Sequence, residues 1–177
     1  MYKKYIKRLL DIIFSIILII ILFPLFIIVG FISLVTTGNI IFKQNRDGLN
    51  KKSFVMYKFK SIKDNRVIPS VMKIIRSFGL DELPQLFNIL KGEMSFVGPR
   101  PFITNEKITK SDSVDPIIYS IRPGVVSMPT AKGRRYVSIQ RRLEYDKEYA
   151  LKVNFKLDIY IIFKTIWVIL SQGIDGD

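Results

Sequence analysis

The stretch Ile12–Val35, IIFSIILIIILFPLFIIVGFISLV, decides the fold of this chain. It runs for 24 residues without a charge and is interrupted only by two serines, one proline and one glycine. A straight helix of that length would measure about 36 Å at about 1.5 Å per residue, enough to cross a bilayer core of about 30 Å. A single-pass transmembrane helix is therefore one interpretation. A cleaved signal peptide is disfavoured, because no small-residue cleavage pattern follows Thr36–Gly38.

The flanks and the middle of this stretch favour a different arrangement. Positive charges lie close to both of its ends: Lys3, Lys4, Lys7 and Arg8 precede it, and Lys43, Arg46, Lys51 and Lys52 follow it. Neither end is therefore typical of an extracytoplasmic segment. Pro24 leaves 12 residues before it and 11 after it, and each arm would reach about 16–18 Å, roughly half a bilayer. We expect residues 1–37 to form a re-entrant helix-break-helix that enters and leaves by the cytoplasmic leaflet.

Composition narrows the chemistry that the chain can perform. It has 177 residues, a formal net charge of +13 and neither histidine nor cysteine. Thiolate nucleophiles, serine–histidine hydrolysis and cysteine–histidine hydrolysis are thereby excluded, and a bound metal would be a hard, oxygen-ligated cation such as Mg²⁺. The basic balance favours a polyanionic partner. Nucleic acid, an anionic membrane surface and nucleotide or lipid phosphates all fit on charge alone.

The remainder of the chain, residues 38–177, is expected to form one compact cytoplasmic domain of the α+β class, mainly α with a small β-hairpin. Ile40–Phe42 and Ser53–Tyr57 are typical of short strands. The turn-rich sequence Asn45–Gly48 lies between them, which predicts a hairpin at the membrane edge.

Apolar spacing predicts three helices in this domain. The first covers Val71–Phe78, with a predicted buried stripe at Val71, Ile74, Ile75 and Phe78, and Gly79 ends it in the left-handed conformation. A second, amphipathic helix is expected between Ile139 and Ala150. A third covers Leu157–Leu170, which is too short to span a membrane and is therefore a core or an interfacial helix.

The segment Leu80–Leu86, LDELPQL, carries an acidic pair in a strongly basic chain. We expect Asp81 to be the N-cap of a helix that ends at Lys91 and Gly92, with Pro84 in the first turn, where its missing N–H costs nothing. The predicted buried stripe of this helix consists of Leu83, Leu86, Phe87 and Leu90. Free N–H groups and the helix dipole at such a position favour ionised carboxylates and attract phosphate.

These residues can support phosphate chemistry. An ionised aspartate such as Asp81 can attack phosphorus, and a divalent metal reduces the repulsion between that nucleophile and an anionic phosphate. The segment Gly92–Pro101, GEMSFVGPRP, adds Arg100 in a stiff loop flanked by prolines, where a guanidinium can bind phosphate through two hydrogen bonds. Each feature also has a plainer interpretation: an ordinary helix cap for Asp81 and Glu82, and a surface arginine for Arg100.

Taken together, the motifs resemble those of the bacterial sugar transferases, specifically the small monotopic polyprenyl-phosphate phosphoglycosyl transferases. The similarity extends from residue 7 to residue 165, nearly the whole chain. Its parts are KRLLD at Lys7–Asp11, QNR at Gln44–Arg46 with Gly48, KFKS at Lys58–Ser61, Arg76, LDELPQL at Leu80–Leu86, GEMSFVGPRP at Gly92–Pro101 and RPG at Arg122–Gly124. No single fragment is specific, but the combination is.

The resemblance implies transfer of a sugar-1-phosphate from a UDP-sugar to undecaprenyl phosphate, with release of UMP and a requirement for Mg²⁺. It implies a monotopic enzyme at the cytoplasmic face of the bacterial inner membrane, with residues 38–177 as the catalytic domain and amphipathic helices at the interface. The partners would be the two substrates and the membrane, and not nucleic acid. The sugar, the glycan pathway and the oligomeric state do not follow from it.

The resemblance also implies roles for individual residues. Asp81 would be the nucleophile that attacks the sugar-linked phosphorus and expels UMP through a covalent aspartyl-phospho-sugar intermediate. Glu82 would assist by positioning the metal or accepting a proton, so both carboxylates are candidate metal ligands. The substrate phosphates would be bound by four basic residues: Lys58, Arg76, Arg100 and Arg134. For Lys58, a solvated lysine at a strand end is an equal alternative.

The chain departs from the family pattern in two places that matter for function. Val125–Lys132 reads VVSMPTAK where the family usually has a threonine–glycine stretch, which leaves the sugar undetermined. Phe23 stands where the family often has a serine before the membrane proline. Two other functions therefore stay open: a membrane-anchored basic module that binds anionic lipid or nucleic acid, and a transferase scaffold without activity.

Overall fold

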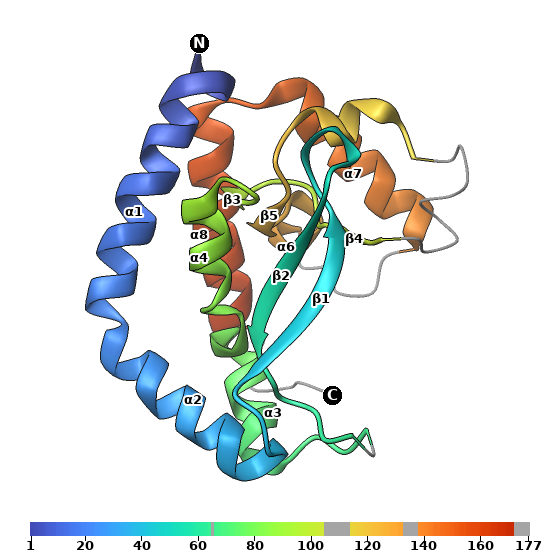
Figure 1. The fold of residues 1–177 in the computed structure, drawn as a ribbon. Helices are drawn as coiled ribbons and strands as arrows, with labels where there is room; N and C mark the ends of the chain where they lie inside the picture. The colour runs from blue at the N-terminus through green and yellow to red at the C-terminus, as the bar shows by residue number, and fades with distance from the viewer. Residues whose placement is uncertain (65, 105–113, 133–137, 172–177) are drawn as a thin grey trace.

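A computed structural model describes residues 1–64, 66–104, 114–132 and 138–171 (Figure 1). These residues are mainly helical with two small sheets, in agreement with the expected α+β class. The longer helices are α1 (Lys7–Ile21), α2 (Phe23–Thr37), α3 (Ser70–Ser77), α4 (Gln85–Lys91), α7 (Ile139–Lys152) and α8 (Phe155–Ser171). Shorter helical segments are η1 (Tyr2–Ile6), η2 (Leu49–Lys51), η3 (Leu80–Glu82), η4 (Pro116–Ser120) and α6 (Met128–Ala131).

The sheets are small and lie in the middle of the molecule. The predicted hairpin is confirmed: β1 (Ile41–Asp47) pairs antiparallel with β2 (Ser53–Phe59). The short strand β4 (Phe102–Ile103) adds to the other edge of β1. A separate parallel pair is formed by β3 (Ser95–Val97) and β5 (Gly124–Val126), which brings the segments on either side of residues 105–113 together.

The turn of the hairpin lies further along the chain than predicted. Asn45–Asp47, three of the four predicted turn residues, pair with β2 inside the ladder, and the chain reverses over Gly48–Lys52 instead. Asn50 and Lys51 have positive φ angles of 55° and 59°, which allow the reversal there. The polar residues of β1 misled the prediction because this strand is largely exposed, and an exposed strand carries polar side chains as readily as a turn does.

The apolar N-terminal stretch forms two helices, α1 and α2, with the break where it was predicted. The chain leaves helical geometry at Leu22, and Pro24 falls in the first turn of α2, where its missing N–H leaves no gap. In the part of the chain that the structure describes, no single helix has both the length and the apolarity to cross a membrane. Tyr2–Ile21 and Phe23–Thr37 meet these criteria only as a pair, bent by 69°.

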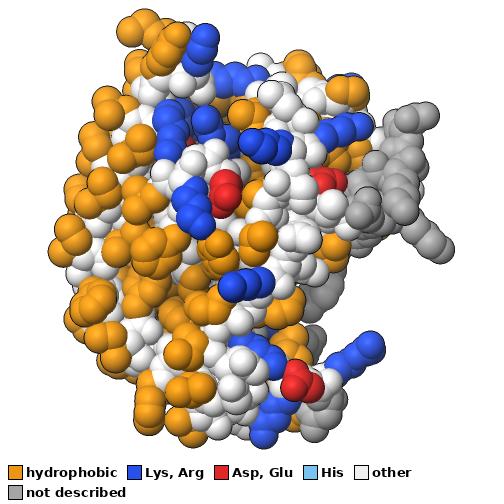
Figure 2. Space-filling model, in the orientation of Figure 1, with side chains coloured by type: hydrophobic (Ala, Val, Ile, Leu, Met, Phe, Trp, Pro, Cys, Tyr) orange, Lys and Arg blue, Asp and Glu red, His pale blue; other side chains and the backbone are white. Residues whose placement is uncertain are grey.

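These two helices carry buried polar residues on their inner faces, beside apolar ones such as Val29, and their outer faces are apolar. Asp11 and Ser15 of α1 are buried, whereas Ile20 is 69% exposed. On α2, Ser33 is buried and Phe31 is 65% exposed. Figure 2 shows the resulting apolar surface along this flank of the molecule. An exposed face this apolar is unlike the polar outer face of a soluble amphipathic helix, and it is what a lipid-facing surface requires.

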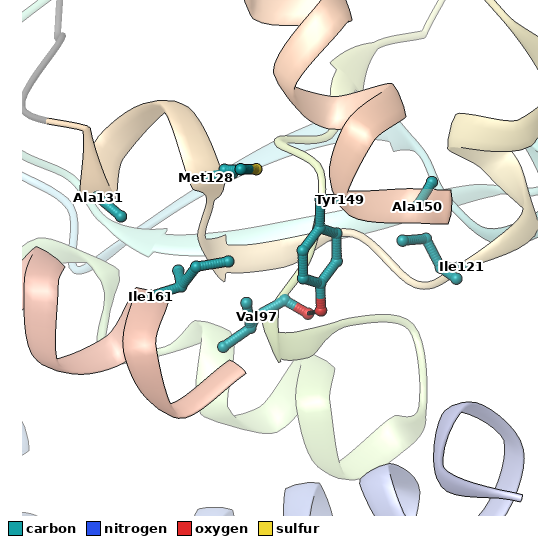
Figure 3. Close-up of a cluster of buried hydrophobic side chains, with 7 residues drawn as sticks. All are labelled: Val97, Ile121, Met128, Ala131, Tyr149, Ala150 and Ile161. Carbon is teal, nitrogen blue, oxygen red and sulfur yellow. Dashed lines mark hydrogen bonds between the residues drawn. The ribbon is translucent and has the colours of Figure 1, made fainter. Parts of the chain in front are cut away.

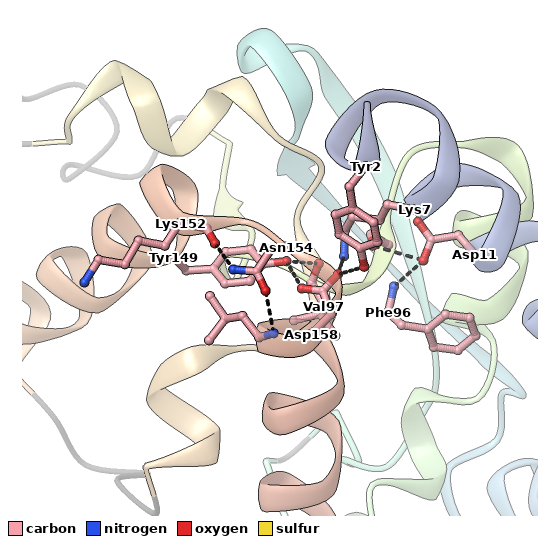
Figure 4. Close-up of polar contacts among 11 residues, drawn as sticks. Tyr2, Lys7, Asp11, Phe96, Val97, Tyr149, Lys152, Asn154 and Asp158 are labelled. Carbon is pink, nitrogen blue, oxygen red and sulfur yellow. Dashed lines mark hydrogen bonds and ion pairs between the residues drawn. The ribbon is translucent and has the colours of Figure 1, made fainter.

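The polar inner face of α1 binds the C-terminal helices through one buried carboxylate (Figure 4). Asp158 of α8 accepts hydrogen bonds from the hydroxyls of Tyr2 and Tyr149, both at 2.6 Å, and forms an ion pair with Lys7. The Tyr149 hydroxyl also contacts the carbonyl of Val97 in β3 at 3.2 Å. A buried charge requires such partners, and here they come from three different elements, η1, α1 and α7.

Two further polar side chains join the N-terminal helices to the sheets. Asp11 of α1 accepts hydrogen bonds from the Ser95 hydroxyl at 3.0 Å and from the Phe96 backbone N–H at 3.1 Å. Ser33 of α2 donates to the carbonyl of Lys60 at 2.6 Å, just after β2. The helix pair is therefore bonded to the remainder of the fold along its length.

The core consists of separate apolar clusters on the two sides of the sheets. One lies between α6, α7, α8 and the parallel strands (Figure 3), and contains Val97, Ile121, Met128, Ala131, Tyr149, Ala150 and Ile161. The others lie between the hairpin, α3, α4 and the N-terminal helices, and contain Phe54, Met56, Leu86, Ile89 and Met94, and Val29, Phe59, Met72 and Ile75. These second clusters fix the position of α4, which follows the acidic pair.

The predicted helix over Val71–Phe78 is present as α3, but of its predicted buried stripe only Ile75 is buried. Met72 and Ile75 are buried against α2 and β2, whereas Val71, Ile74 and Phe78 are 39–49% exposed. Apolar spacing identifies a helix and its apolar residues, but it does not distinguish a face that contacts protein from one that contacts lipid.

The last helix, α8, has one face in the core and one exposed apolar face, which is compatible with both locations that the sequence allowed. Ile161 and Val168 are buried in the core, while Phe163 and Trp167 on the other side are 66% and 58% exposed. Lys164 lies over the Trp167 ring at 3.8 Å. An exposed aromatic residue beside a lysine is typical of a helix that lies at a membrane surface.

Candidate active site

The acidic pair lies in a short 3-10 turn, η3, between α3 and α4. Gly79, with a φ angle of 69°, ends α3 and begins this turn, as predicted for the end of the helix. The prediction that Asp81 caps the next helix is wrong: Pro84 occupies the N-cap position of α4, and no side chain caps the helix. Leu80–Glu82 form a separate turn, so the Asp81 carboxylate makes no capping hydrogen bond to α4.

The helix α4 is anchored by an asparagine that the sequence reasoning missed. Asn88 is fully buried; its Oδ1 accepts from the Tyr57 backbone N–H at 3.1 Å, and its Nδ2 donates to the carbonyl of Val55 at 2.7 Å. It thereby binds α4 to β2. Its position could have been predicted, because Asn88 is the one polar residue in the apolar run Leu86–Leu90. Phe87, which belonged to the predicted buried stripe, is 44% exposed, because Asn88 and its neighbours occupy the inner face.

Four of the six predicted site residues come together around this turn. Lys58, on β2, forms an ion pair with Glu82, with 2.5 Å between Nζ and Oε1. Arg76, on α3, donates from Nη1 to the Ser61 hydroxyl at 2.9 Å. Both cations lie close enough to Asp81 to lower the pKa of its carboxyl group. Three separate elements therefore place two cations beside two carboxylates.

The environment of Asp81 raises the pKa of its carboxyl group toward neutral pH. The side chain is only 6% exposed. Burial, and then the neighbouring Glu82 carboxylate, raise the pKa of Asp81 to about 6, while Lys58 and Arg76 oppose that rise. At neutral pH the group is mostly ionised, and it is poorly hydrated because it is buried. A poorly hydrated carboxylate between cations suits attack on an anionic phosphate.

Arg100 is placed elsewhere. It is the exposed residue of an otherwise buried loop between β3 and β4, and none of its described contacts joins it to Asp81. Its carbonyl accepts from Nη2 of Arg142 at 2.6 Å, and the next carbonyl, that of Pro101, accepts from Nη1 of Arg46 at 3.1 Å. The loop is therefore held by its own backbone, which leaves the Arg100 side chain available to a ligand. Arg134, the sixth predicted residue, lies outside the described residues.

A buried aspartate on α7 supports the Arg100 loop. Asp146 is fully buried and lies 3.5 Å from Nε of Arg142. Burial raises the pKa of Asp146 to about 7, while Arg142 and the Arg100 backbone favour its charged form. Sequence reasoning did not select Asp146 or Arg142, since neither belongs to a local motif that signals a site.

The donor set at the acidic turn fits a hard divalent cation held together with a substrate. Among the residues that the structure describes, no three acidic side chains gather as a complete metal site. Asp81 and Glu82 nevertheless offer adjacent carboxylate oxygens, of which those of Asp81 have no ion-pair partner among the described contacts. Mg²⁺ commonly binds through one or two carboxylates plus substrate phosphates and water. These two residues would hold it.

The fold and the site together define a class of protein: an α+β protein in which two adjacent carboxylates and two cations meet at one turn, beside an apolar helix pair. Comparison with known proteins gives the family. The family model for bacterial sugar transferases matches residues 2–172, so the chain belongs to that family, and the resemblance inferred from its motifs is confirmed.

Several relatives support this assignment. The chain is 33% identical to an undecaprenyl-phosphate galactose phosphotransferase of Salmonella typhimurium, over 96% of this chain and 41% of that protein. It is 33% identical to the exopolysaccharide production protein ExoY of Sinorhizobium fredii, over 94% of this chain and 87% of that protein. A UDP-glucose:undecaprenyl-phosphate glucose-1-phosphate transferase of Klebsiella pneumoniae is also 33% identical, over 91% and 39% respectively. The chain thus spans about two fifths of the length of some relatives and most of the length of another.

Proposed function

We propose that this chain transfers a sugar-1-phosphate from a UDP-sugar to undecaprenyl phosphate at the cytoplasmic face of the bacterial inner membrane. The observation that carries the proposal is the position of Asp81: a buried carboxylate, free of capping contacts, with Glu82, Lys58 and Arg76 around it. The names of relatives that act on undecaprenyl phosphate support the choice of substrates.

In the first step, a carboxylate oxygen of Asp81 forms a bond to the sugar-linked phosphorus of the UDP-sugar. The bond between that phosphorus and the oxygen that bridges to the uridine phosphate breaks. UMP leaves with the bridging oxygen and its electron pair, and an aspartyl-phospho-sugar remains. No proton transfer is required if the nucleophile is ionised beforehand, which the pKa of Asp81 near 6 permits at neutral pH.

In the second step, a phosphate oxygen of undecaprenyl phosphate attacks the same phosphorus. The bond to Asp81 breaks, and the free carboxylate is regenerated. The product is a lipid-linked pyrophosphate that carries the sugar. Water must be kept from the covalent intermediate between the two steps, and the burial of Asp81 serves this purpose.

The cations would neutralise the phosphate charges in both steps. Lys58 and Arg76 lie beside the acidic turn. Arg100 would contribute if substrate binding brings its loop to the site, and Arg134 is a further proposed phosphate ligand. A bound Mg²⁺, held by Asp81 and Glu82, would supply further charge neutralisation of the phosphates. Glu82 is held by Lys58, so it can orient a cation without moving far.

The apolar outer faces of α1 and α2 support a membrane location. They would enter one leaflet as a re-entrant pair, with the polar inner face of α1 turned toward the catalytic domain. The lipid-borne phosphate lies at the membrane surface. A site that is built directly against the membrane helices can therefore accept a lipid substrate without extracting it from the bilayer.

Incubation of the purified protein with radiolabelled UDP-sugars, Mg²⁺ and undecaprenyl phosphate, followed by organic extraction, tests this function. We expect label in the organic phase and stoichiometric UMP. D81N should abolish both while leaving membrane association intact. Full turnover by D81N would exclude the covalent mechanism. Salt-sensitive binding of anionic lipid or nucleic acid without any turnover would instead favour a binding module.

A further inference from the structure

Arg8 of α1 binds the end of the helix that follows the acidic turn. Its Nη1 donates to the carbonyl of Ile89 at 2.5 Å, and its Nη2 donates to the carbonyl of Leu90 at 2.8 Å. Both carbonyls belong to the last turn of α4, where the helix does not satisfy its own acceptors fully. The guanidinium also faces the negative end of the helix dipole. One side chain of the N-terminal helix pair therefore holds the end of α4.

A second arginine binds the adjoining carbonyl. Nε of Arg122 donates to the carbonyl of Gly92 at 2.7 Å. Gly92 ends α4 with a φ angle of 85°, and a Cβ atom at this position would lie 3.4 Å from Nη2 of Arg8. The glycine supplies the left-handed conformation, and the Arg8 guanidinium packs directly against it. The end of α4 is held from two directions.

Movement of this end would be transmitted to the acidic turn. The helix has seven residues, a length of about 10 Å at the helical rise. Its first turn is bonded to the residues before it, from Leu86 N–H to the Leu83 carbonyl at 3.0 Å and from Phe87 N–H to the Pro84 carbonyl at 3.2 Å. The acidic turn and α4 are therefore continuous in hydrogen bonding.

Apolar contacts link the same two helices. Leu18 and Ile19 of α1 pack against the cluster that contains Leu86 and Ile89 of α4. The apolar contact sets the distance between the helices. Because it is not directional, it does not stop one helix from sliding along the other. The two hydrogen bonds from Arg8 to the backbone fix the axial position, because they are directional.

We propose that Arg8, assisted by Arg122, is a positioning residue for Asp81 and couples the docking of the N-terminal helices to the geometry of the acidic turn. This inference rests on the proposed role of Asp81 as the nucleophile. It assigns to α1 a function beyond anchoring: the reacting carboxylate takes its place when α1 is docked against α4.

Two variants separate positioning from charge. R8K keeps the positive charge that a cytoplasmic N-terminus requires, but a lysine does not offer the planar pair of donors that bind two successive carbonyls. K4Q removes a neighbouring positive charge from a residue that has no described contact with α4. A role in membrane topology alone predicts that R8K is harmless and K4Q harmful, whereas positioning predicts the opposite.

The experiment measures steady-state turnover and hydrogen–deuterium exchange of wild type, R8K, R122K and K4Q in lipid nanodiscs. We expect R8K to lower kcat by about 10- to 100-fold, as misplacement of a catalytic group by about 1 Å does, with less than a threefold change in the KM for the UDP-sugar. Exchange over residues 80–92 should increase in R8K. R122K should, like R8K, lower kcat and increase exchange over residues 80–92. K4Q should change neither kcat nor this exchange.

The pH profile adds a readout that loss of folded protein would not alter. If α4 shifts, Asp81 becomes better hydrated, and the acid limb of kcat/KM should move to lower pH in R8K but not in K4Q. The proposal would be overturned if R8K kept the kcat of the wild type, or if its exchange over residues 80–92 were that of the wild type. It would also be overturned if K4Q lost as much kcat as R8K. If the wild type shows no turnover, the proposed function fails, and the exchange data alone decide whether Arg8 positions the turn.

Discussion

At the scale of single residues, the reactivity of Asp81 is set by opposing neighbours. Burial and Glu82 raise the pKa of its carboxyl group to about 6, whereas Lys58 and Arg76 lower it. An unperturbed aspartate would be ionised at any physiological pH, so the raised pKa reflects the burial of Asp81, which would protect the proposed intermediate, rather than a need for a base. The chemistry thus depends on residues from three elements.

These opposing influences predict the pH dependence of turnover. The acid limb of kcat/KM should lie near pH 6, because only ionised Asp81 attacks phosphorus. E82Q removes a carboxylate that raises the pKa, so its limb should move to lower pH. K58M removes a cation that lowers the pKa, so its limb should move to higher pH. Rate profiles between pH 4.5 and 8.5 check both, with R76K as the charge-preserving control; shifts in one common direction would contradict the assignment.

Burial of the same carboxylate also predicts a stability effect. Because the pKa of Asp81 is raised on folding, its charged form destabilises the folded state above pH 6, and this effect disappears below pH 4. The difference from the ordinary value corresponds to roughly 3 kcal/mol at most, at about 1.4 kcal/mol per pKa unit. D81N should therefore raise the thermal unfolding temperature at pH 8 but not at pH 4. Scans at the two pH values measure it, with E144Q, a change at an exposed carboxylate, as control; a lower unfolding temperature for D81N at pH 8 would contradict the prediction.

At the scale of elements, α4 is the part that assembles the site. It is short, so its position is set by its neighbours rather than by its own stability. Asn88 binds it to β2, and Arg8 and Arg122 bind its other end. The site residues are correctly placed only if all these contacts form.

Replacement of Asn88 should show this dependence. N88A leaves the buried Tyr57 N–H and Val55 carbonyl without their partner, at about 1–3 kcal/mol each. We expect the unfolding temperature to fall by several degrees. We also expect N88A to lose turnover at temperatures at which it is still folded. F87L, a change on the exposed side of the same helix, is the matched control. Unfolding of N88A at the wild-type temperature would show that α4 does not depend on this amide.

At the scale of the whole molecule, the apolar outer face of α1 and α2 predicts how the chain lies in the membrane. The sequence contains no cysteine, so each introduced cysteine is unique. In sealed cells, K4C at the N-terminus and K52C beyond the hairpin turn should both be protected from an impermeant external reagent and react after lysis. I20C, on the exposed apolar face beside the bend, should react slowly in both cases because lipid covers it. Reaction of K4C from outside would contradict the re-entrant arrangement and support a spanning helix.

The sequence alone determined the family, the break in the apolar stretch, the hairpin, the main helices and the types of residue available for chemistry. These are local properties: runs of apolar residues, glycine and proline positions, and short motifs. Only the tertiary structure decided which faces are buried on α3 and α4, that Asp81 does not cap a helix, and that Arg8 holds α4. The decisive contacts join residues 24 positions apart for Lys58 and Glu82, and 81 apart for Arg8 and Ile89. Such pairs leave no local pattern, because their energies arise only after separate elements have packed together.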